Sequence, residues 1–538
     1  MTASSKRANA SQPADQQSRW YVSTTIPYVN ARPHIGFALE LVLTDALARY
    51  HRRVGEDVFF LSGTDENALK NVQSAESEGV PVAELVDRNS LRFRELGQTL
   101  EISSDDFIRT SADPRHAPGV HKLWEACARN GDIYKRQYRG LYCVRCELFY
   151  REDELIDGLC PIHHIPPEEV EEENYFFRLS RYAEQLESLI ASDTLGVVPE
   201  TRKNEVLSFI RRGLEDFSIS RSRERAHGWG IPVPGDPSQV IYVWYDALGN
   251  YITALGYAND GPLYQRYWQD NSQRLHVLGK DVIRFHAVYW PAMLLSAQVP
   301  LPTTLLVHGF ITLGGQKISK SLGNVVDPEQ LVADYGVDSV RYFLLREVSP
   351  FADSDFTLER FQRVCNTDLA DQLGNLLNRT VSMIQRYQEG TIPASGELTA
   401  AEHVVVERAR NLPGQVDTAV RGCASNEALA DIWELVGEAN RYVAETEPWV
   451  LAKQRKAGDR DAAQRLDTVL YTLAETLRLV AHLLVPFLPD TAAKIAAQLG
   501  VALDGDLPWT SVTAWGQLPA GTRVQPGAVL FRKWELAD

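Results

Sequence analysis

The feature that most constrains the fold is an alternation of strand and helix patterns in the first part of the chain. "YVSTTI" from Tyr21 is a short apolar run typical of a buried strand, and "IGFALELVLTDALARYHRR" from Ile35 has apolar residues at helical spacing. "DVFFLSGTDE" from Asp57 is a second strand that ends in polar residues. This order predicts a parallel sheet whose functional site lies at the carboxyl ends of its strands.

The rest of the chain divides by pattern. Strand and helix patterns resume at "VIYVWYDALGNYITAL", "LHVLGKDVIRFHAVYWPAML" and "TLLVHGFITL", after a cysteine-bearing insertion. After about Phe356 the segments are long and amphipathic, which predicts a helical bundle. We therefore expect an α/β, Rossmann-type parallel-sheet domain split by an insertion and followed by an all-α domain. The expected parts are a disordered tail (1–19), the first half of a nucleotide-binding domain (20–126), a connective insertion (127–235), the second half of that domain (236–313), a lysine-loop and linker region (314–358) and a helical domain (359–538).

Charge and hydropathy exclude few classes of function. The formal net charge of −16 argues against a generally basic nucleic-acid coat, but local basic clusters such as "ISRSRERAHGWG" leave a nucleic-acid partner possible. The first nineteen residues lack the apolar run of a signal peptide, and no apolar run reaches membrane-spanning length. A cytoplasmic location is expected.

Four residues have the spacing of a zinc site. "CVRC" (Cys143 and Cys146) is followed, after thirteen intervening residues, by "CPIH" (Cys160 and His163). Two closely spaced ligand pairs match tetrahedral zinc, and a site closed by four protein ligands is structural. His164 is a competing ligand, although the two-residue spacing favours His163. One structural Zn²⁺ per chain is predicted.

Two distant stretches carry groups suited to phosphate. In "PHIGF", His34 and Gly36 lie where a strand passes into a helix, and a helix amino end favours an anionic phosphate. In "GGQKISKSLGN", Lys317 and Lys320 follow two glycines, with Ser319 and Ser321 beside them. Ammonium groups at this spacing can follow the charge that develops on a transferring phosphoryl group.

Together these stretches resemble the paired His-x-Gly-His and Lys-Met-Ser-Lys-Ser signatures of class I aminoacyl-tRNA synthetases. With "IPYVNARPHIG", "FLSGTDE", "GLYCVRCELFY" and "VIYVWYDALGNY", they look like the methionyl-tRNA synthetase family within that class. The likeness extends from Trp20 to the end of the chain. It implies a methionine–tRNA ligase that forms methionyl-adenylate from ATP, with Mg²⁺ assisting, and then charges initiator and elongator tRNA(Met).

The resemblance also assigns residues to the three ligands. Catalysis would rest on His34, Lys317 and Lys320. ATP would be bound by Gly36, Glu40, Gly279, Asp281, Ile311, Ser319 and Ser321. Methionine would lie among Ile26, Tyr28, Trp244, Ala247, Leu248, Tyr251, Phe285 and His286, with Asp65 on its ammonium group. The anticodon would be held by Asn375 and Arg379, four residues apart on one helical face, and by Trp449, whose ring can stack on a base.

The chain departs from the family pattern at a few positions. Phe37 stands where a second histidine is usual, and Asn67 and Ala68 replace a His-Gly pair. Phenylalanine cannot donate a hydrogen bond to phosphate, and the loss of such a donor can cost about 2.7–4 kcal/mol. Our hypothesis is that activation survives because the other phosphate contacts remain.

Two alternatives stay open at this point. One is a synthetase-like ligase that passes its activated amino acid to a small-molecule acceptor. The other is a tRNA-binding paralogue that has lost catalysis. The complete helical domain argues against the first, and the intact His34, Asp65, Lys317 and Lys320 argue against the second. The chain ends soon after the bundle, without the appended domain that dimerises some family members, so a monomer is expected.

Overall fold

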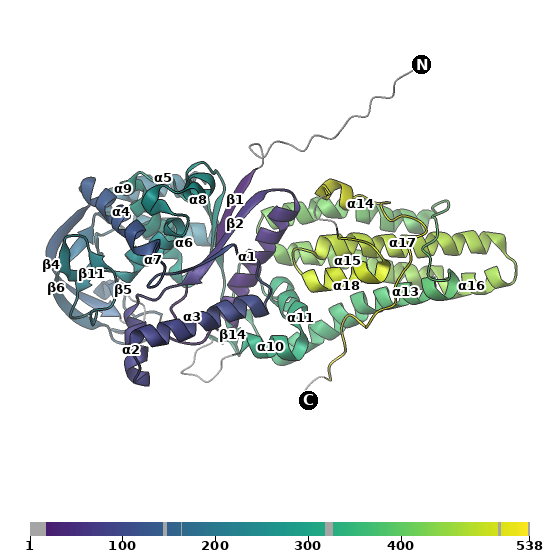
Figure 1. Cartoon of the computed structure of the whole chain (residues 1–538), viewed down its shortest axis with the longest axis horizontal. Helices are drawn as coiled ribbons and strands as arrows, with labels where there is room; N and C mark the ends of the chain where they lie inside the picture. Colours follow the sequence, from purple (N-terminus) through teal and green to yellow (C-terminus); the bar gives the residue numbers. More distant parts are fainter. Residues whose placement is uncertain (1–17, 144–147, 163, 318–325, 504–506, 536–538) are drawn as a thin grey trace, which may run out of the picture.

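The computed structural model describes residues 18–143, 148–162, 164–317, 326–503 and 507–535. An α/β part and an elongated bundle of helices lie side by side along the long axis of the molecule (Figure 1). Among the described residues, no helix combines the length and the apolar character needed to cross a membrane.

The centre of the α/β part is a six-stranded sheet in which every pair of neighbours is parallel. From one edge to the other its strands are β3 (Asp106–Arg109), β2 (Asp57–Thr64), β1 (Arg19–Ser23), β12 (Arg274–Gly279), β13 (Thr304–His308) and β7 (Gly196–Val198). The predicted parallel sheet is therefore confirmed, with β1 and β12 in the middle. The last strand, β7, comes from the segment expected to form the insertion.

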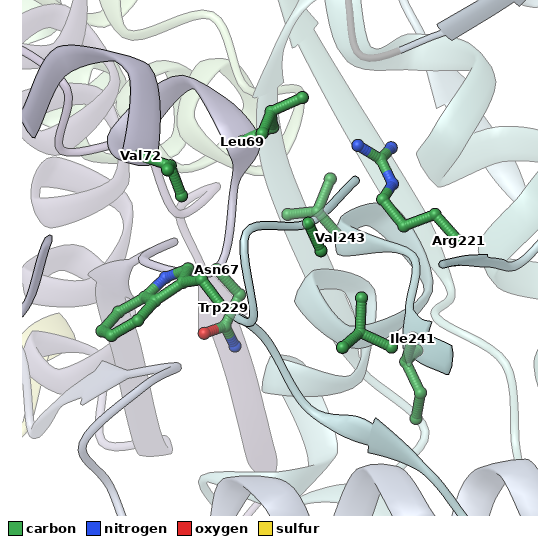
Figure 2. Close-up of a pocket in the computed structure, with 9 residues that line it drawn as sticks. Asn67, Leu69, Val72, Arg221, Trp229, Ile241 and Val243 are labelled. Atoms are coloured by element: carbon green, nitrogen blue, oxygen red, sulfur yellow. The ribbon is translucent and has the colours of Figure 1, made fainter. Parts of the chain in front are cut away.

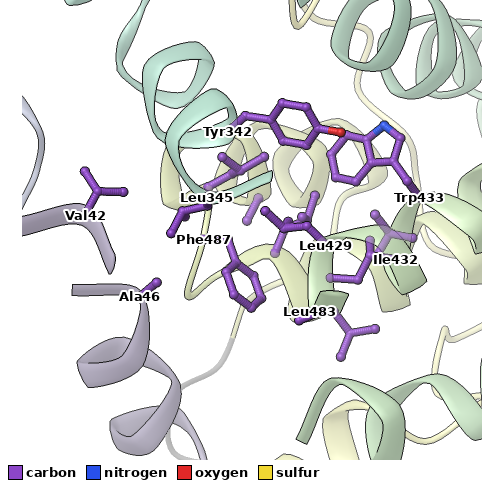
Figure 3. Close-up of a cluster of buried hydrophobic side chains, with 14 of the residues drawn as sticks. Val42, Ala46, Tyr342, Leu345, Leu429, Ile432, Trp433, Leu483 and Phe487 are labelled. Carbon is purple, nitrogen blue, oxygen red and sulfur yellow. The ribbon is translucent and has the colours of Figure 1, made fainter. Parts of the chain in front are cut away.

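Helix α1 (Ile35–Arg53) follows β1 over the predicted residues and connects it to β2. Most of its side chains are buried on all sides, because it lies between the sheet and the helical bundle (Figure 1). Val42 and Ala46 join a hydrophobic cluster with Leu345, Leu429 and Phe487 from the later part of the chain (Figure 3). The helix is thus shared by the cores of both parts.

Further helices lie around the sheet and belong to the connections between its strands. These are α2 (Leu69–Glu78), α3 (Val82–Thr99), α4 (His116–Arg129), α7 (Val243–Thr253), α8 (Pro262–Tyr264) and α9 (Trp290–Ala297). A π-helical turn, η7 (Phe285–Tyr289), precedes α9.

The inserted segment forms an arm built on the antiparallel pair β4 (Ile133–Cys143) and β6 (Glu168–Phe177). Its other elements are β5 (Leu148–Tyr150), β8 (Phe217–Ser218), β9 (Ser220–Ser222), β10 (Pro232–Val233), β11 (Asp236–Ile241), α5 (Ala183–Ala191) and α6 (Glu200–Arg211). After β13, the chain forms a small separate sheet of β14 (Ile311–Leu313), β15 (Gln316–Lys317) and β16 (Ser354–Asp355).

The carboxyl-terminal part is helical, as the amphipathic periodicity predicted. It contains α10 (Pro328–Tyr335), α11 (Val337–Tyr342), α12 (Leu358–Val364), α13 (Asn375–Tyr387), α14 (Ala400–Arg421), α15 (Ser425–Thr446), α16 (Pro448–Lys456), α17 (Arg460–Leu484), α18 (Pro489–Leu499) and α19 (Trp509–Val512). Residues Cys365–Gly374 add a π-helical stretch before α13.

Candidate active site and tRNA-binding surface

His34 caps the amino end of α1 with its own side chain. Its Nδ1 accepts the backbone N–H of Gly36 at 3.0 Å. Because Nδ1 is an acceptor, the neutral ring carries its hydrogen on Nε2, which can donate to an anion. A Cβ at Gly36 would lie 2.8 Å from His34 Cε1, so a larger residue there would displace the ring from this position. The predicted His-x-Gly element therefore places an imidazole donor at a helix amino end, where phosphate is favoured.

Phe37 belongs to the core. It is 8% exposed, and its ring packs edge-on against Phe93 of α3 with a centroid distance of 5.3 Å. Phe37 therefore contributes apolar burial to the contact between α1 and α3.

Glu40 lies one helical turn further along α1 and forms a buried network at the edge of the sheet. Its Oε1 accepts the N–H and the hydroxyl of Thr25 at 2.7 and 2.6 Å, and its Oε2 is 3.0 Å from Nε2 of His308. Nδ1 of His308 faces the Gly309 carbonyl oxygen at 2.8 Å, so both ring nitrogens donate. Burial lowers the pKa of His308, but the hydrogen bond with Glu40 and the charge of Glu40 outweigh burial and raise it above its ordinary value.

The other predicted ATP residues meet this network. A Cβ on Gly279 would lie 3.0 Å from Asp281 Oδ1 and 3.7 Å from His308 Cε1, so these groups surround one point at the end of β12. Ile311, at the start of β14, is buried. His308 was not among the predicted site residues, because its role depends on a contact with Glu40 across 268 positions of sequence.

The predicted methionine residues come together as an aromatic wall. Trp244 stacks on Phe285 with centroids 3.6 Å apart and ring planes 5° from parallel, and Tyr28 meets Trp244 edge-on at 6.3 Å. Ile26, Leu248 and Tyr251 belong to the hydrophobic cluster that includes Phe285, and Ala247 is buried beside Leu248. Asp65 is 2% exposed and pairs with Tyr28 through a parallel β-bridge. The backbone of Asp65 thus lies beside that of Tyr28, one of the aromatic residues of this wall.

His286 is held as a neutral ring at the base of this wall. Its Nδ1–H donates a hydrogen bond to the Val282 carbonyl oxygen at 2.9 Å. In this neutral tautomer, Nε2 accepts a hydrogen bond from the Tyr251 hydroxyl at 2.7 Å. Burial lowers the pKa of His286 to about 4. A second buried histidine, His276, lies 4.0 Å from the Tyr251 ring centroid and bonds Ser23 at 2.7 Å. Sequence reasoning missed His276 and Ser23, because nothing distinguishes them from ordinary strand residues.

The unusual Asn67–Ala68 pair lies beside the aromatic wall. Ala68 is fully buried against Tyr242 and Val243, with Trp244 packed on the same small cluster. Asn67 lines a small cavity of about 10 Å³ with Trp229 and Ile241 (Figure 2). The Trp229 indole N–H donates to the carbonyl oxygen of Glu66 at 2.8 Å, which fixes this side of the loop.

The lysine stretch begins in a hairpin between β14 and β15. Gly314 and Gly315 form its turn with φ of 60° and 74°, a conformation that glycine adopts readily. Asp355 accepts the Gly315 N–H at 2.9 Å and the Thr312 hydroxyl at 2.8 Å. The side chain of Lys317 and all of Ser319, Lys320 and Ser321 lie outside the described residues, so their predicted approach to His34 is not tested.

The predicted zinc ligands are described only in part. Cys143 and Cys160 are fully buried in one cluster with Tyr150, whereas His164 is exposed. Cys146 and His163 lie outside the described residues, and within the part of the chain that is described no three candidate ligands form a metal-binding group. Two buried thiols at neighbouring positions fit the soft donor set of zinc.

The predicted anticodon residues lie on the exposed surface of the helical part. Asn375 and Arg379 are exposed on α13, and Arg379 donates to the Asn375 carbonyl oxygen at 3.4 Å and to Oδ1 of Asn440 on α15 at 3.2 Å. Trp449 is 47% exposed at the start of α16, and Arg455 of the same helix donates to the Tyr387 carbonyl oxygen at the end of α13. Asn375 and Arg379 therefore lie on α13, and Trp449 lies on α16, a helix that contacts the end of α13.

This combination of a parallel nucleotide-binding sheet, an imidazole at the amino end of α1 and an appended helical domain defines a class I aminoacyl-tRNA synthetase. The chain matches the family described as "tRNA synthetases class I (M)" over residues 20–166 and 153–381, and "Anticodon binding domain of methionyl tRNA ligase" over residues 392–538. Within the class, the chain belongs to the methionyl-tRNA synthetase family.

Individual relatives agree with this assignment. A methionine–tRNA ligase of Caldanaerobacter subterraneus subsp. tengcongensis is 45% identical over 95% of this chain and 78% of that protein. One from Brucella suis biovar 1 is 46% identical over 91% of this chain and 93% of that protein. The solved Mycobacterium tuberculosis methionyl-tRNA synthetase in complex with methionyl-adenylate has a TM-score of 0.91 and 42% identity, covering 96% of this chain and all of that chain.

Proposed function

We propose that this chain charges tRNA(Met) in the cytoplasm by activating L-methionine with ATP and transferring the methionyl group to the tRNA 3′ end. The observation that carries the proposal is the aromatic wall of Tyr28, Trp244 and Phe285 next to the buried Asp65. An unbranched thioether packs well on aromatic rings, and sulfur–ring contacts contribute about 0.3–1.5 kcal/mol each. The carboxylate pairs with the substrate ammonium group and so selects an α-amino acid.

Activation is an in-line displacement at the α-phosphorus. The methionine carboxylate oxygen attacks, the bond to the bridging oxygen breaks, and pyrophosphate leaves with that electron pair. His34 donates from Nε2 to the phosphate oxygens, beside the N–H groups of the α1 amino end. Mg²⁺ bound with ATP supplies further neutralisation of phosphate charge. The ribose is assigned to Glu40, Gly279 and Asp281, which meet around His308, and the base is assigned to Ile311.

Lys317 and Lys320, with Ser319 and Ser321, complete the phosphate contacts in this proposal. Phe37 contributes none, since its ring is committed to the core. Stabilisation of the leaving pyrophosphate therefore rests on His34, the helix terminus and the two lysines.

Transfer then joins the methionyl group to tRNA. A hydroxyl of the terminal ribose attacks the carbonyl carbon of the adenylate, AMP leaves, and the hydroxyl proton is released. Asn375, Arg379 and Trp449 hold the anticodon, with Trp449 stacking on a base. Cys143, Cys146, Cys160 and His163 would hold one structural Zn²⁺, which would stabilise the arm. Metal analysis of the purified chain should find one zinc per chain, and Cys143→Ser should abolish it.

Pyrophosphate exchange with each amino acid, followed by charging of initiator and elongator tRNA(Met), tests the proposal. Methionine-dependent exchange and charging of both tRNAs are expected. Exchange without charging would point to a small-molecule acceptor, and no exchange with any amino acid would leave a tRNA-binding protein.

A further inference from the structure

The loop between β2 and α2 connects the two halves of the proposed methionine site. Asp65 lies at its start, and Asn67 reaches across to the helix that carries Trp244. Methionine would contact both elements, because its ammonium group meets Asp65 and its side chain meets α7. Its affinity therefore depends on the separation between β2 and α7.

Asn67 forms hydrogen bonds to both sides of the proposed site, to Asp65 after β2 and to Asp246 on α7. Its backbone N–H donates to Asp65 Oδ1 at 3.2 Å. Its side-chain amide donates to Asp246 Oδ2 on α7 at 3.2 Å and is 3.4 Å from the Thr110 carbonyl oxygen after β3. An amide NH₂ group has two hydrogens, so both acceptors can be bonded at once.

Asp246 is a firm anchor for this contact. It is fully buried, and its other oxygen, Oδ1, faces Nε2 of His116 at 3.4 Å. Nδ1 of His116 is in turn 2.8 Å from the hydroxyl of Thr253, near the end of α7. The carboxylate is thus fixed on one side by α4 and on the other by Asn67, and it lies two residues from Trp244 and one from Ala247.

We propose that Asn67 is a positioning residue that sets the distance between Asp65 and the aromatic wall on α7, and thereby sets the affinity for methionine and its selection over other amino acids. The neighbouring Ala68 supports this role, because it packs on Tyr242 and Val243 immediately before Trp244. The inference rests on the proposed activation of methionine.

A charge swap tests the contact directly. In Asn67→Asp, two carboxylates face each other, and we expect the KM for methionine in pyrophosphate exchange to rise by roughly ten-fold or more. In the double variant Asn67→Asp/Asp246→Asn, the new amide donates to the new carboxylate, and most of the wild-type KM should return. The single variant Asp246→Asn completes the double-mutant cycle of positions 67 and 246. The KM for ATP should stay within about two-fold throughout, because the hydrogen bonds of Asn67 go to Asp65, Thr110 and Asp246, and none of these is assigned to ATP.

A matched control separates positioning from general destabilisation. Asn130 donates from its amide to the buried Asp132 at 2.7 Å, away from the methionine site, so Asn130→Asp creates a similar repulsion elsewhere. It should lower the Tm without changing the KM for methionine. Asn67→Ser, which adds no charge, gives a second measure if Asn67→Asp folds poorly, and it should also raise the methionine KM.

The outcomes are distinguishable. If wild type shows no methionine-dependent exchange, the proposed function fails. If wild type is active but the Asn67 variants change only Tm, or change the two KM values equally, or are not rescued by the swap, the positioning role is refuted.

Discussion

Arg341 is the side chain whose removal we expect to separate amino-acid activation from tRNA charging. It is fully buried and joins the α/β part of the molecule to the helical part. It forms an ion pair with Asp45 of α1 at 2.8 Å, and it donates to the carbonyl oxygen of Leu100 at 3.0 Å and to that of Phe487 at 2.8 Å. Asp45 and Leu100 belong to the α/β part, and Phe487 belongs to the helical part.

The cost of Arg341→Ala follows from these partners. Removing one member of a buried ion pair typically costs about 3–5 kcal/mol, and each carbonyl left without a donor adds up to about 1–3 kcal/mol when water cannot reach it. In the variant, Asp45 would still form its ion pair with Arg49 at 2.7 Å and accept the backbone N–H and the hydroxyl of Ser103 at 2.7 and 2.6 Å. These remaining contacts limit the loss of stability. Burial raises the pKa of Asp45, but Arg341, Arg49 and Ser103 together hold it below its ordinary value. We expect a loss of about 3–5 kcal/mol in the free energy of unfolding.

The functional effect should be unequal. Pyrophosphate exchange uses the α/β part alone, whereas charging requires both parts to hold one tRNA in register. Under conditions where the variant is folded, exchange should change by less than about three-fold and charging kcat/KM should fall by about ten-fold or more, since small misplacements of reacting groups are costly. Urea unfolding and the two assays on the same preparation measure these quantities.

Arg478→Ala is the matched control. Arg478 is also buried, pairs with Glu475 at 2.7 Å and donates to the Ala514 carbonyl oxygen at 2.8 Å, but all these partners belong to the helical part. It should lose comparable stability while the ratio of charging to exchange stays near wild type. A loss below about 1 kcal/mol for Arg341→Ala, or an equal change of that ratio in Arg478→Ala, would refute the reasoning.

Three other predictions concern the candidate active site. Gly36→Ala should displace the His34 ring, because the added Cβ would lie 2.8 Å from Cε1, and should lower the kcat of pyrophosphate exchange by about 10²-fold at nearly unchanged methionine KM. Phe37→Ala should lower the free energy of unfolding by about 3–5 kcal/mol in urea unfolding. In pyrophosphate exchange, Lys317→Ala or Lys320→Ala should lower the rate far more than the milder variant Phe37→Leu. Equal losses of exchange would contradict our assignment of the phosphate contacts. Because the folded-state pKa of His308 is raised, its protonated ring stabilises the fold below the unfolded histidine pKa of about 6.5, and this contribution is lost as the pH rises through the folded-state pKa. The stability difference between wild type and His308→Gln should therefore shrink as the pH is raised, and a difference that grows with pH would be inconsistent with the ion pair to Glu40.

The sequence was most informative where the signal is local. The bounds of α1 follow from its apolar spacing and from His34 before it, and both are confirmed. The strand patterns after Trp20 and Asp57 likewise gave β1 and β2, although β1 begins at Arg19, within the segment expected to be a tail. Local periodicity suffices here, because a helix or strand depends mainly on neighbouring residues.

The contacts that organise the site join residues far apart in the chain and were not predicted. Glu40 meets His308, and Asn67 meets Asp246 across 179 positions. An isolated histidine or aspartate in a strand or helix pattern has no sequence signal for such a partner. The family resemblance supplied the methionine residues, but it could not show how the unusual Asn67 is used.

Helix α1 explains why a core phenylalanine at position 37 is compatible with a catalytic helix. Its amino end carries His34, its middle holds Asp45 against Arg341, and the hydroxyl of Tyr50 near its end donates to Asp417 of α14 at 2.7 Å. Over its 19 residues the helix spans about 28 Å, so it connects the position of His34 to the helical part as one element. A side chain that anchors this element, as Phe37 does on Phe93, contributes to the placement of His34 even though it cannot donate to phosphate. In the proposed activation, Phe37 therefore acts through the position of the His34 imidazole at the start of α1, and makes no phosphate contact of its own.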